Sequence, residues 1–165
     1  MITKIFVVSD IHCPDRISAV PDIGEYILSS DVVFALGDFT RASVLEHIRG
    51  FGRQVYAVNG NMDEAKLKLE LPSKRIVEIE GFKIGLTHGV GAPLGIDKRV
   101  ASSFDRKLDA YVFGHSHISV NRTIEGSLYF NPGALSAREP SFGFLYVEQK
   151  NIWGEIVLLK KGDEK

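Results

Sequence analysis

Five short apolar runs in this chain are each followed at once by side chains that can bind a metal ion. The runs cover residues 5–8, 32–36, 54–58, 83–86 and 110–113. The side chains that follow them belong to Asp10, His12, Asp38, Asn61, His88, His115 and His117. Runs of this length that are rich in β-branched and aromatic residues predict buried strands. The chain is therefore expected to contain strands whose carboxyl ends carry polar side chains.

Segments with helical spacing lie between several of these runs. We expect a helix over 15–30, with Pro21 either near its first turn or at the start of a second short helix. Further helices are expected over 41–49, with Thr40 as cap and Gly50 as stop, before Pro72, and over 97–108. The pair Glu80-Gly81 predicts a hairpin turn, and beyond residue 113 only strands are expected, over 120–124, 128–130, 143–147 and 152–159. This order predicts an α/β protein with two packed sheets and helices outside. The 165 residues are expected to form one domain, with a charged and frayed tail over Lys160–Lys165.

The seven polar residues are expected to meet. Ligands of α/β proteins bind beyond the carboxyl ends of strands, so side chains at a shared edge of a sheet would converge. Each residue has a structural explanation by itself: Asp10 and Asp38 as helix caps, Asn61 as a turn residue, His88 as a core histidine. Seven such coincidences favour a site instead. Four of the five histidines belong to this set, and His47 is expected on the solvent side of a helix.

Two carboxylates, four imidazoles and one amide form a nitrogen and oxygen donor set without a thiolate. Such a set favours Mn, Fe, Zn, Ni or Co over a structural zinc site. Seven donors suit two divalent ions with one carboxylate shared between them. The charge of two such ions exceeds that of Asp10 and Asp38, and this surplus suits an anionic substrate, phosphate above all.

At these residues the sequence resembles the calcineurin-like metallophosphoesterases. The resemblance is carried by Asp10-Ile-His12, Gly37-Asp38, Gly60-Asn61-Met62-Asp63, His88-Gly89 and Gly114-His115-Ser116-His117. The later motif Asn131-Pro132-Gly133-Ala-Leu-Ser136-Ala-Arg138 narrows it to the small, single-domain YfcE-like phosphodiesterases.

This resemblance implies a four-layer α/β/β/α sandwich and a binuclear centre. One ion would be held by Asp10, His12 and His117, the other by Asn61, His88 and His115, with Asp38 bridging and Asn61 also touching the substrate phosphate. Small phosphodiesters would be hydrolysed by attack of a metal-bound hydroxide. Manganese is the expected metal, and Ni, Fe, Zn, Co and Mg are the alternatives.

The position after Asn61 departs from the wider family. Many members carry a histidine there that protonates the leaving group, whereas this chain has Met62, which holds no proton. Asp63 is the nearest ionisable candidate for a catalytic acid, with a helix N-cap as its structural alternative. Arg138 is a candidate phosphate contact that could equally be a surface arginine. Cys13 is expected to be a small buried hydrophobe or an inert thiol.

Composition limits the partners. The net charge is −1 and no long basic run exists, so nucleic acid is not an expected partner. No apolar stretch approaches the ~20 residues of a membrane span, and one cysteine fits a reducing, cytoplasmic setting. A homodimer is compatible with the edge strands. Specificity is expected to come from the loops 89–97 and 133–141.

Two other functions are alternatives to the small phosphodiesterase. One is a non-catalytic protein-interaction scaffold of the same fold, resembling a retromer subunit whose metal site is altered. The other is a nuclease, but nucleases of this superfamily usually carry extra domains or basic surfaces that this chain lacks. Intact ligands at all seven positions favour the enzyme over the scaffold.

Overall fold

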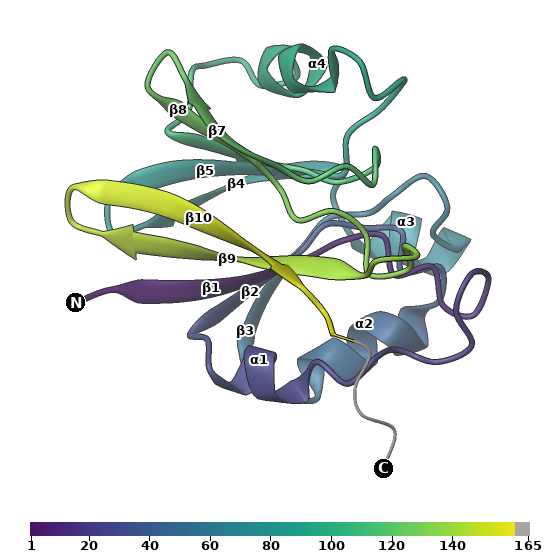
Figure 1. The fold of residues 1–165 in the computed structure, drawn as a ribbon. Helices are drawn as coiled ribbons and strands as arrows, with labels where there is room; N and C mark the ends of the chain where they lie inside the picture. Colours follow the sequence, from purple (N-terminus) through teal and green to yellow (C-terminus); the bar gives the residue numbers. More distant parts are fainter. Residues whose placement is uncertain (161–165) are drawn as a thin grey trace.

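The computed structural model describes residues 1–160, and the chain forms two five-stranded sheets packed face to face (Figure 1). Most of the tail expected to fray, residues 161–165, lies outside the described residues. In chain order the elements are β1 (Thr3–Val8), α1 (Gly24–Leu28), β2 (Val32–Ala35), α2 (Ala42–Arg49), β3 (Gln54–Ala57), α3 (Ala65–Glu70), β4 (Lys74–Ile79), β5 (Phe82–Thr87), α4 (Ile96–Ser102), β6 (Ala110–Val112), β7 (Val120–Ile124), β8 (Ser127–Asn131), β9 (Ser141–Glu148) and β10 (Asn151–Leu158). The strand order is β10-β9-β1-β2-β3 in one sheet and β4-β5-β6-β8-β7 in the other.

The period of two along β1 distributes its side chains between two cores. Ile5 and Val7 face the second sheet and pack with Leu86 and Val112 in the core between the sheets. Phe6 and Val8 point the opposite way, into a separate core under the helices. Because both faces of this central strand are buried, its sequence is a continuous apolar run and not an alternating one.

Helices cover the outer faces of both sheets. The outer core of the first sheet contains Ile27 from α1, Leu45 from α2 and Leu67 from α3. On the far side, α4 packs Val100 against Tyr111 and Phe113 of the second sheet. Figure 1 shows α4 at one side of the sandwich and α1 with α2 at the other. The predicted α/β/β/α sandwich is confirmed.

Two helices are shorter than their apolar spacing predicted. The expected helix over 15–30 is reduced to α1, because Pro21 lacks the N–H that a continuous helix needs and the chain before it runs in turns. The expected helix over 97–108 ends at Ser102, where the Ser102 and Ser103 hydroxyls donate to carbonyls of the preceding turn. Phe104 still reaches the core without helical backbone.

The predicted cap of α2 was also wrong. Thr40 has a φ of 79°, which is incompatible with the extended backbone of a capping residue, and Arg41 occupies the N-cap position instead. The first helical amide, that of Ala42, donates to the Glu64 carboxylate at 2.7 Å. This acidic group belongs to the turn before α3, so the cap comes from a different part of the chain.

The strand ends that carry the polar residues emerge at one end of the sandwich. β1, β2 and β3 are parallel neighbours in the first sheet, and β5 and β6 are parallel neighbours in the second. The expectation of a single shared edge therefore needs correction, because the site is assembled from two sheets. Among residues 1–160, no helix is long and apolar enough to cross a membrane.

Candidate metal centre

Five of the seven predicted ligand residues adopt left-handed backbone conformations. The φ angles are 56° for Asp10, 46° for His12, 54° for Asp38, 68° for His115 and 61° for His117. Such a conformation costs a residue with a Cβ roughly 1–2 kcal/mol. Backbone hydrogen bonds hold this conformation: the Asp10 amide donates to the Gly37 carbonyl at 3.1 Å, and the His12 amide donates to the backbone carbonyl of Asp38 at 2.9 Å. These bonds continue the pairing of β1 with β2 beyond the strand ends.

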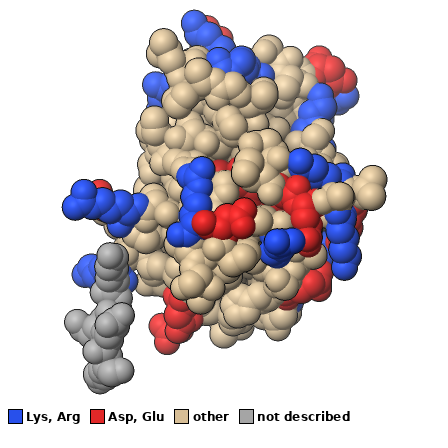
Figure 2. Space-filling view, turned by 90° about the vertical axis from the view of Figure 1, so that its right-hand side faces the viewer, with Lys and Arg blue, Asp and Glu red and all other residues tan. Residues whose placement is uncertain are grey.

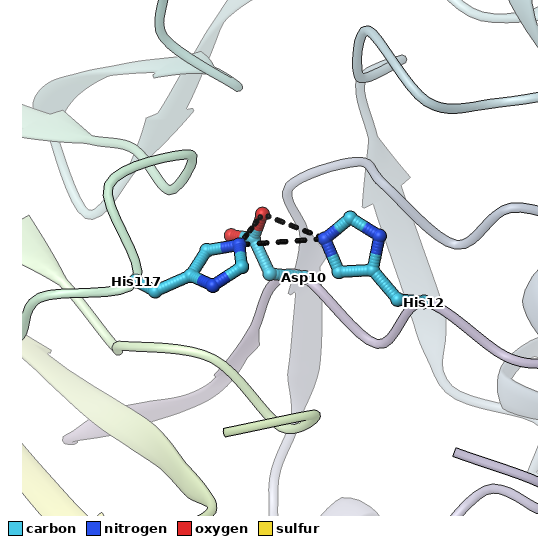
Figure 3. A group of neighbouring side chains, drawn as sticks. All are labelled: Asp10, His12 and His117. Atoms are coloured by element: carbon cyan, nitrogen blue, oxygen red, sulfur yellow. Dashed lines mark hydrogen bonds and ion pairs between the residues drawn. The ribbon is translucent and has the colours of Figure 1, made fainter. Parts of the chain in front are cut away.

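Asp10, His12 and His117 form the first cluster (Figure 3). The Asp10 Oδ1 atom lies 3.1 Å from Nε2 of His117 and 3.5 Å from Nε2 of His12. The two histidine Nε2 atoms are 3.4 Å apart. Asp10 is fully buried, and its other oxygen accepts hydrogen bonds from the Ser9 hydroxyl and the His115 amide. The carboxylate is thereby held with Oδ1 directed at both imidazoles.

Asp38, His88 and His115 form the second cluster. The Asp38 Oδ2 atom lies 3.1 Å from Nε2 of His88 and 3.5 Å from Nε2 of His12. The Asp38 carboxylate therefore faces one residue of each cluster. Its Oδ1 atom accepts a hydrogen bond from the Met62 amide at 2.8 Å, which fixes its orientation.

Asn61 lies beside the second cluster at the open side of the site. Its Oδ1 atom is 3.1 Å from Nδ1 of His115, and the residue is exposed. Asn61 lines a cavity of about 310 Å³ together with residues of both clusters, including His12, Asp38 and His117. The structure thus brings all seven predicted side chains to one place.

The charges of the clusters stabilise one another. Burial alone would raise the pKa of Asp10, but hydrogen bonds from His117 and His12 outweigh it and hold that pKa well below its usual value. The pKa of Asp38 is lowered in the same way, chiefly by His88. Burial opposes protonation of His88, yet the adjacent carboxylates of Asp38 and Asp10 raise its pKa. Both carboxylates are therefore anionic at neutral pH.

The donor set suits a divalent cation, and His88 provides the clearest indication. Its Nδ1 atom is 2.7 Å from the Leu36 carbonyl oxygen, which can only accept, so Nδ1 carries the proton. In the neutral ring Nε2 then bears a lone pair. This atom is buried and forms no hydrogen bond of acceptable geometry among residues 1–160, although Oδ2 of Asp38 lies 3.1 Å from it. Metal-binding histidines typically donate their other ring nitrogen to a carbonyl in this way.

Two glycines allow the loops to approach closely enough for this geometry. A Cβ on Gly60 would lie 2.2 Å from Oδ1 of Asp38, and a Cβ on Gly114 would lie 1.9 Å from the Ser9 hydroxyl and 2.7 Å from Oδ2 of Asp10. Any larger residue at either position would displace a carboxylate of the site.

Asp63 is buried and turned toward backbone. Its carboxylate accepts hydrogen bonds from the amides of Gly60, Thr40 and Asp38 at 2.7, 2.9 and 3.1 Å. Burial raises its pKa. These contacts tie the loops after β2 and β3 together and do not support the role of proton donor. The structural alternative of a helix cap is wrong, because α3 has Glu64 at its N-cap position.

The remaining candidates lie outside the two clusters. Arg138 is exposed and lines a separate cavity that borders the site at His117. His47 is exposed on α2, and Cys13 is buried in the helix-side core, as expected.

Arg16 was missed by the sequence analysis. It lines the same cavity as both clusters, with Nη1 3.4 Å from Nδ1 of His117. A single arginine in a loop carries no pattern that distinguishes it from a surface residue.

Comparison with known proteins places the chain in a family. The model of the calcineurin-like phosphoesterase superfamily domain matches residues 3–150. A "probable metallophosphoesterase" of Methanothermobacter thermautotrophicus is 30% identical over 156 residues, covering 92% of this chain and 90% of that protein.

Two solved structures share the fold at lower identity. Vacuolar protein sorting 29 of Cryptosporidium parvum is 24% identical with a TM-score of 0.80, covering 98% of this chain and 93% of its own. A structure described as a novel archaeal phosphodiesterase is 23% identical with a TM-score of 0.72, covering 94% of this chain and 100% of its own.

Proposed function

The chain belongs to the calcineurin-like phosphoesterase superfamily, and from that premise we propose that it is a metal-dependent phosphodiesterase acting on small phosphodiesters. The family supports a metal-dependent phosphoesterase. The observation that carries the proposal is the set of two carboxylates and four imidazoles in two adjacent clusters.

The proposed ligands are divided between two divalent ions, with manganese as the expected metal. Asp10, His12 and His117 would hold one ion, and Asn61, His88 and His115 the other, with Asp38 shared. The shared role of Asp38 is supported by its position, since Oδ2 faces both His12 and His88. When bound, such ions neutralise phosphoryl charge and lower the pKa of water.

The protein's own side chains would position the substrate. Asn61 is exposed at the cavity and could donate its amide to a phosphate oxygen, while the Met62 amide holds Asp38. Met62 is half exposed and cannot protonate a leaving group. We therefore expect the rate to depend steeply on leaving-group pKa, with phenolic esters hydrolysed well and alkyl esters slowly. A flat dependence would show that another acid acts.

Preference for diesters over monoesters is supported by the archaeal phosphodiesterase of the same fold. A cytoplasmic location is supported by the single cysteine, Cys13. The homodimer remains a prediction.

The test is hydrolysis of bis-p-nitrophenyl phosphate and p-nitrophenyl phosphate by chelator-stripped protein with Mn²⁺, Ni²⁺, Zn²⁺ or Mg²⁺ returned. Metal-restored diesterase activity is expected, and Asp38→Ala and His115→Ala should both abolish it. His47→Ala is the matched control, because that histidine is exposed and lies on α2, away from the clusters. Absence of activity with every metal, in protein that binds the ions, would instead favour the interaction scaffold.

A further inference from the structure

A second cavity, of about 440 Å³, lies beside the metal centre. It is bounded by the loop after β3, Lys68 of α3, the start of β4, the loop after β5 and α4. Its volume is that of a typical small-molecule site. Asn61 lines both this cavity and the one that contains the clusters, and His88 of the second cluster lies in its wall. A molecule held here would therefore extend away from the metal centre and remain adjacent to it.

The cavity is distinguished by its charge. Lys68, Lys74 and Arg99 line it, and no Asp or Glu does so. Each of the other cavities described within residues 1–160 has at least one carboxylate in its lining. The surrounding face carries both signs of charge (Figure 2). In a chain with a net charge of −1, a purely cationic cavity favours an anionic occupant.

Arg99 shapes the cavity more than it binds. Its guanidinium donates to the carbonyls of Val90, Ala92 and Leu94, with distances of 2.9 Å to Val90 and 3.1 Å to Leu94. The glycine-rich loop after β5 is thus fastened to α4. The arginine charge stays in the wall, while three of its five N–H donors are already occupied.

The two lysines are available to a ligand. Lys68 and Lys74 are exposed, and their ammonium groups donate to the backbone carbonyls of Asn61 and Ser103. An ammonium group has three donors, so each lysine can bind an anion and keep its backbone contact. Neither lysine forms an ion pair among the described residues.

We propose that this cavity binds the second ester arm of the substrate and selects arms that carry their own anionic group, such as a phosphate. The inference rests on the proposed function, since it places the scissile phosphodiester at the metal centre. The substrate class is then a phosphodiester of an already phosphorylated alcohol.

The test compares two p-nitrophenyl esters of thymidine 5′-phosphate, one with and one without a phosphate on the 3′-hydroxyl. Water adds to phosphorus and p-nitrophenolate leaves in both cases, so only the remote charge differs. We expect a higher kcat/KM for the bisphosphate ester. Lys74→Gln should reduce that preference by about two- to fivefold at low salt, the range for partly exposed charge pairs, and Lys68→Gln with Lys74→Gln should reduce it further.

Lys98→Gln with Lys107→Gln is the matched control, because these lysines line a different cavity beside α4 and should leave the preference unchanged. Calorimetric titration with thymidine 5′-phosphate and its 3′,5′-bisphosphate provides a readout that does not need turnover. The inference would be overturned if the wild type showed equal affinity and equal kcat/KM for the compounds with and without the 3′-phosphate. It would also be overturned if the lysine variants lost the same factor for both compounds. If neither ester is hydrolysed but the bisphosphate still binds through the lysines, the proposed function fails and the cavity assignment stands.

Discussion

The left-handed backbone at the candidate metal centre predicts that the stability difference between glycine and alanine variants has opposite signs at two candidate ligand histidines. At His117, where φ is 61°, alanine keeps a strain of about 1–2 kcal/mol that glycine lacks. Glycine loses about 0.5–1 kcal/mol through the greater freedom of the unfolded chain. His117→Gly should therefore be more stable than His117→Ala, by about 0.5–1 kcal/mol.

His88 is the matched control position. It belongs to the other cluster, but its backbone is not in the left-handed conformation. Only the entropy cost applies there, so His88→Gly should be less stable than His88→Ala by about 0.5–1 kcal/mol. Urea unfolding of the four variants in chelator, followed by circular dichroism, measures both differences without a contribution from bound metal. A difference of the same sign at both positions would refute the argument that the site holds strained backbone.

Further predictions follow from the contacts around the site. Asp63→Ala leaves three backbone amides without their acceptor and should lower the free energy of unfolding, measured in urea, by about 3 kcal/mol or more. Asp105→Ala is the control, because that side chain is exposed and its loss should leave the free energy of unfolding unchanged. Gly60→Ala displaces Asp38 and should reduce kcat by about 100-fold. Gly50→Ala should leave kcat unchanged, because a Cβ there would lie 3.2 Å from its nearest neighbour. Metal at about 1,000 times its Kd should raise the unfolding free energy by about 4 kcal/mol, seen as a higher melting temperature. Burial and the hydrogen bond to Glu155 raise the pKa of Tyr146 to about 12. The contribution of Tyr146 to stability should therefore hold below pH 10 and disappear as the pH rises toward 12. Ultraviolet titration of the wild type against Tyr146→Phe measures this pKa.

The metal-ligand candidates could be predicted because the signal for each is local. A β-branched run fixes a strand, and the side chain that follows it in sequence must lie at the strand end, as Asp38 does after β2. The continuous apolar run over 5–8 is equally local, and it was enough to predict the buried part of β1.

Features that depend on distant contacts were not predicted. Thr40 had the right side chain for a cap, but its left-handed backbone is set by the loop that also carries Asp38, and Glu64 caps α2 from another loop. The strand ends that carry the polar residues are divided between two sheets, and this division depends on which strands pair, over long distances in the sequence. Lys68 and Lys74 belong to the same class, because nothing in their neighbourhood indicates that α3 and β4 border one cavity.

The division between two sheets bears on how the centre works. Each cluster draws on both sheets: Asp10 and His12 follow β1 while His117 follows β6, and Asp38 follows β2 while His88 follows β5. The two sheets are held together by the apolar core between them, which contains Val7, Leu86 and Val112 close to these strand ends. Packing in that core therefore sets the separation of the carboxylates and imidazoles directly. A loss of core volume near Leu86 should move the ligands apart before it unfolds the protein, so that metal affinity reports on packing between the sheets more sensitively than overall stability does.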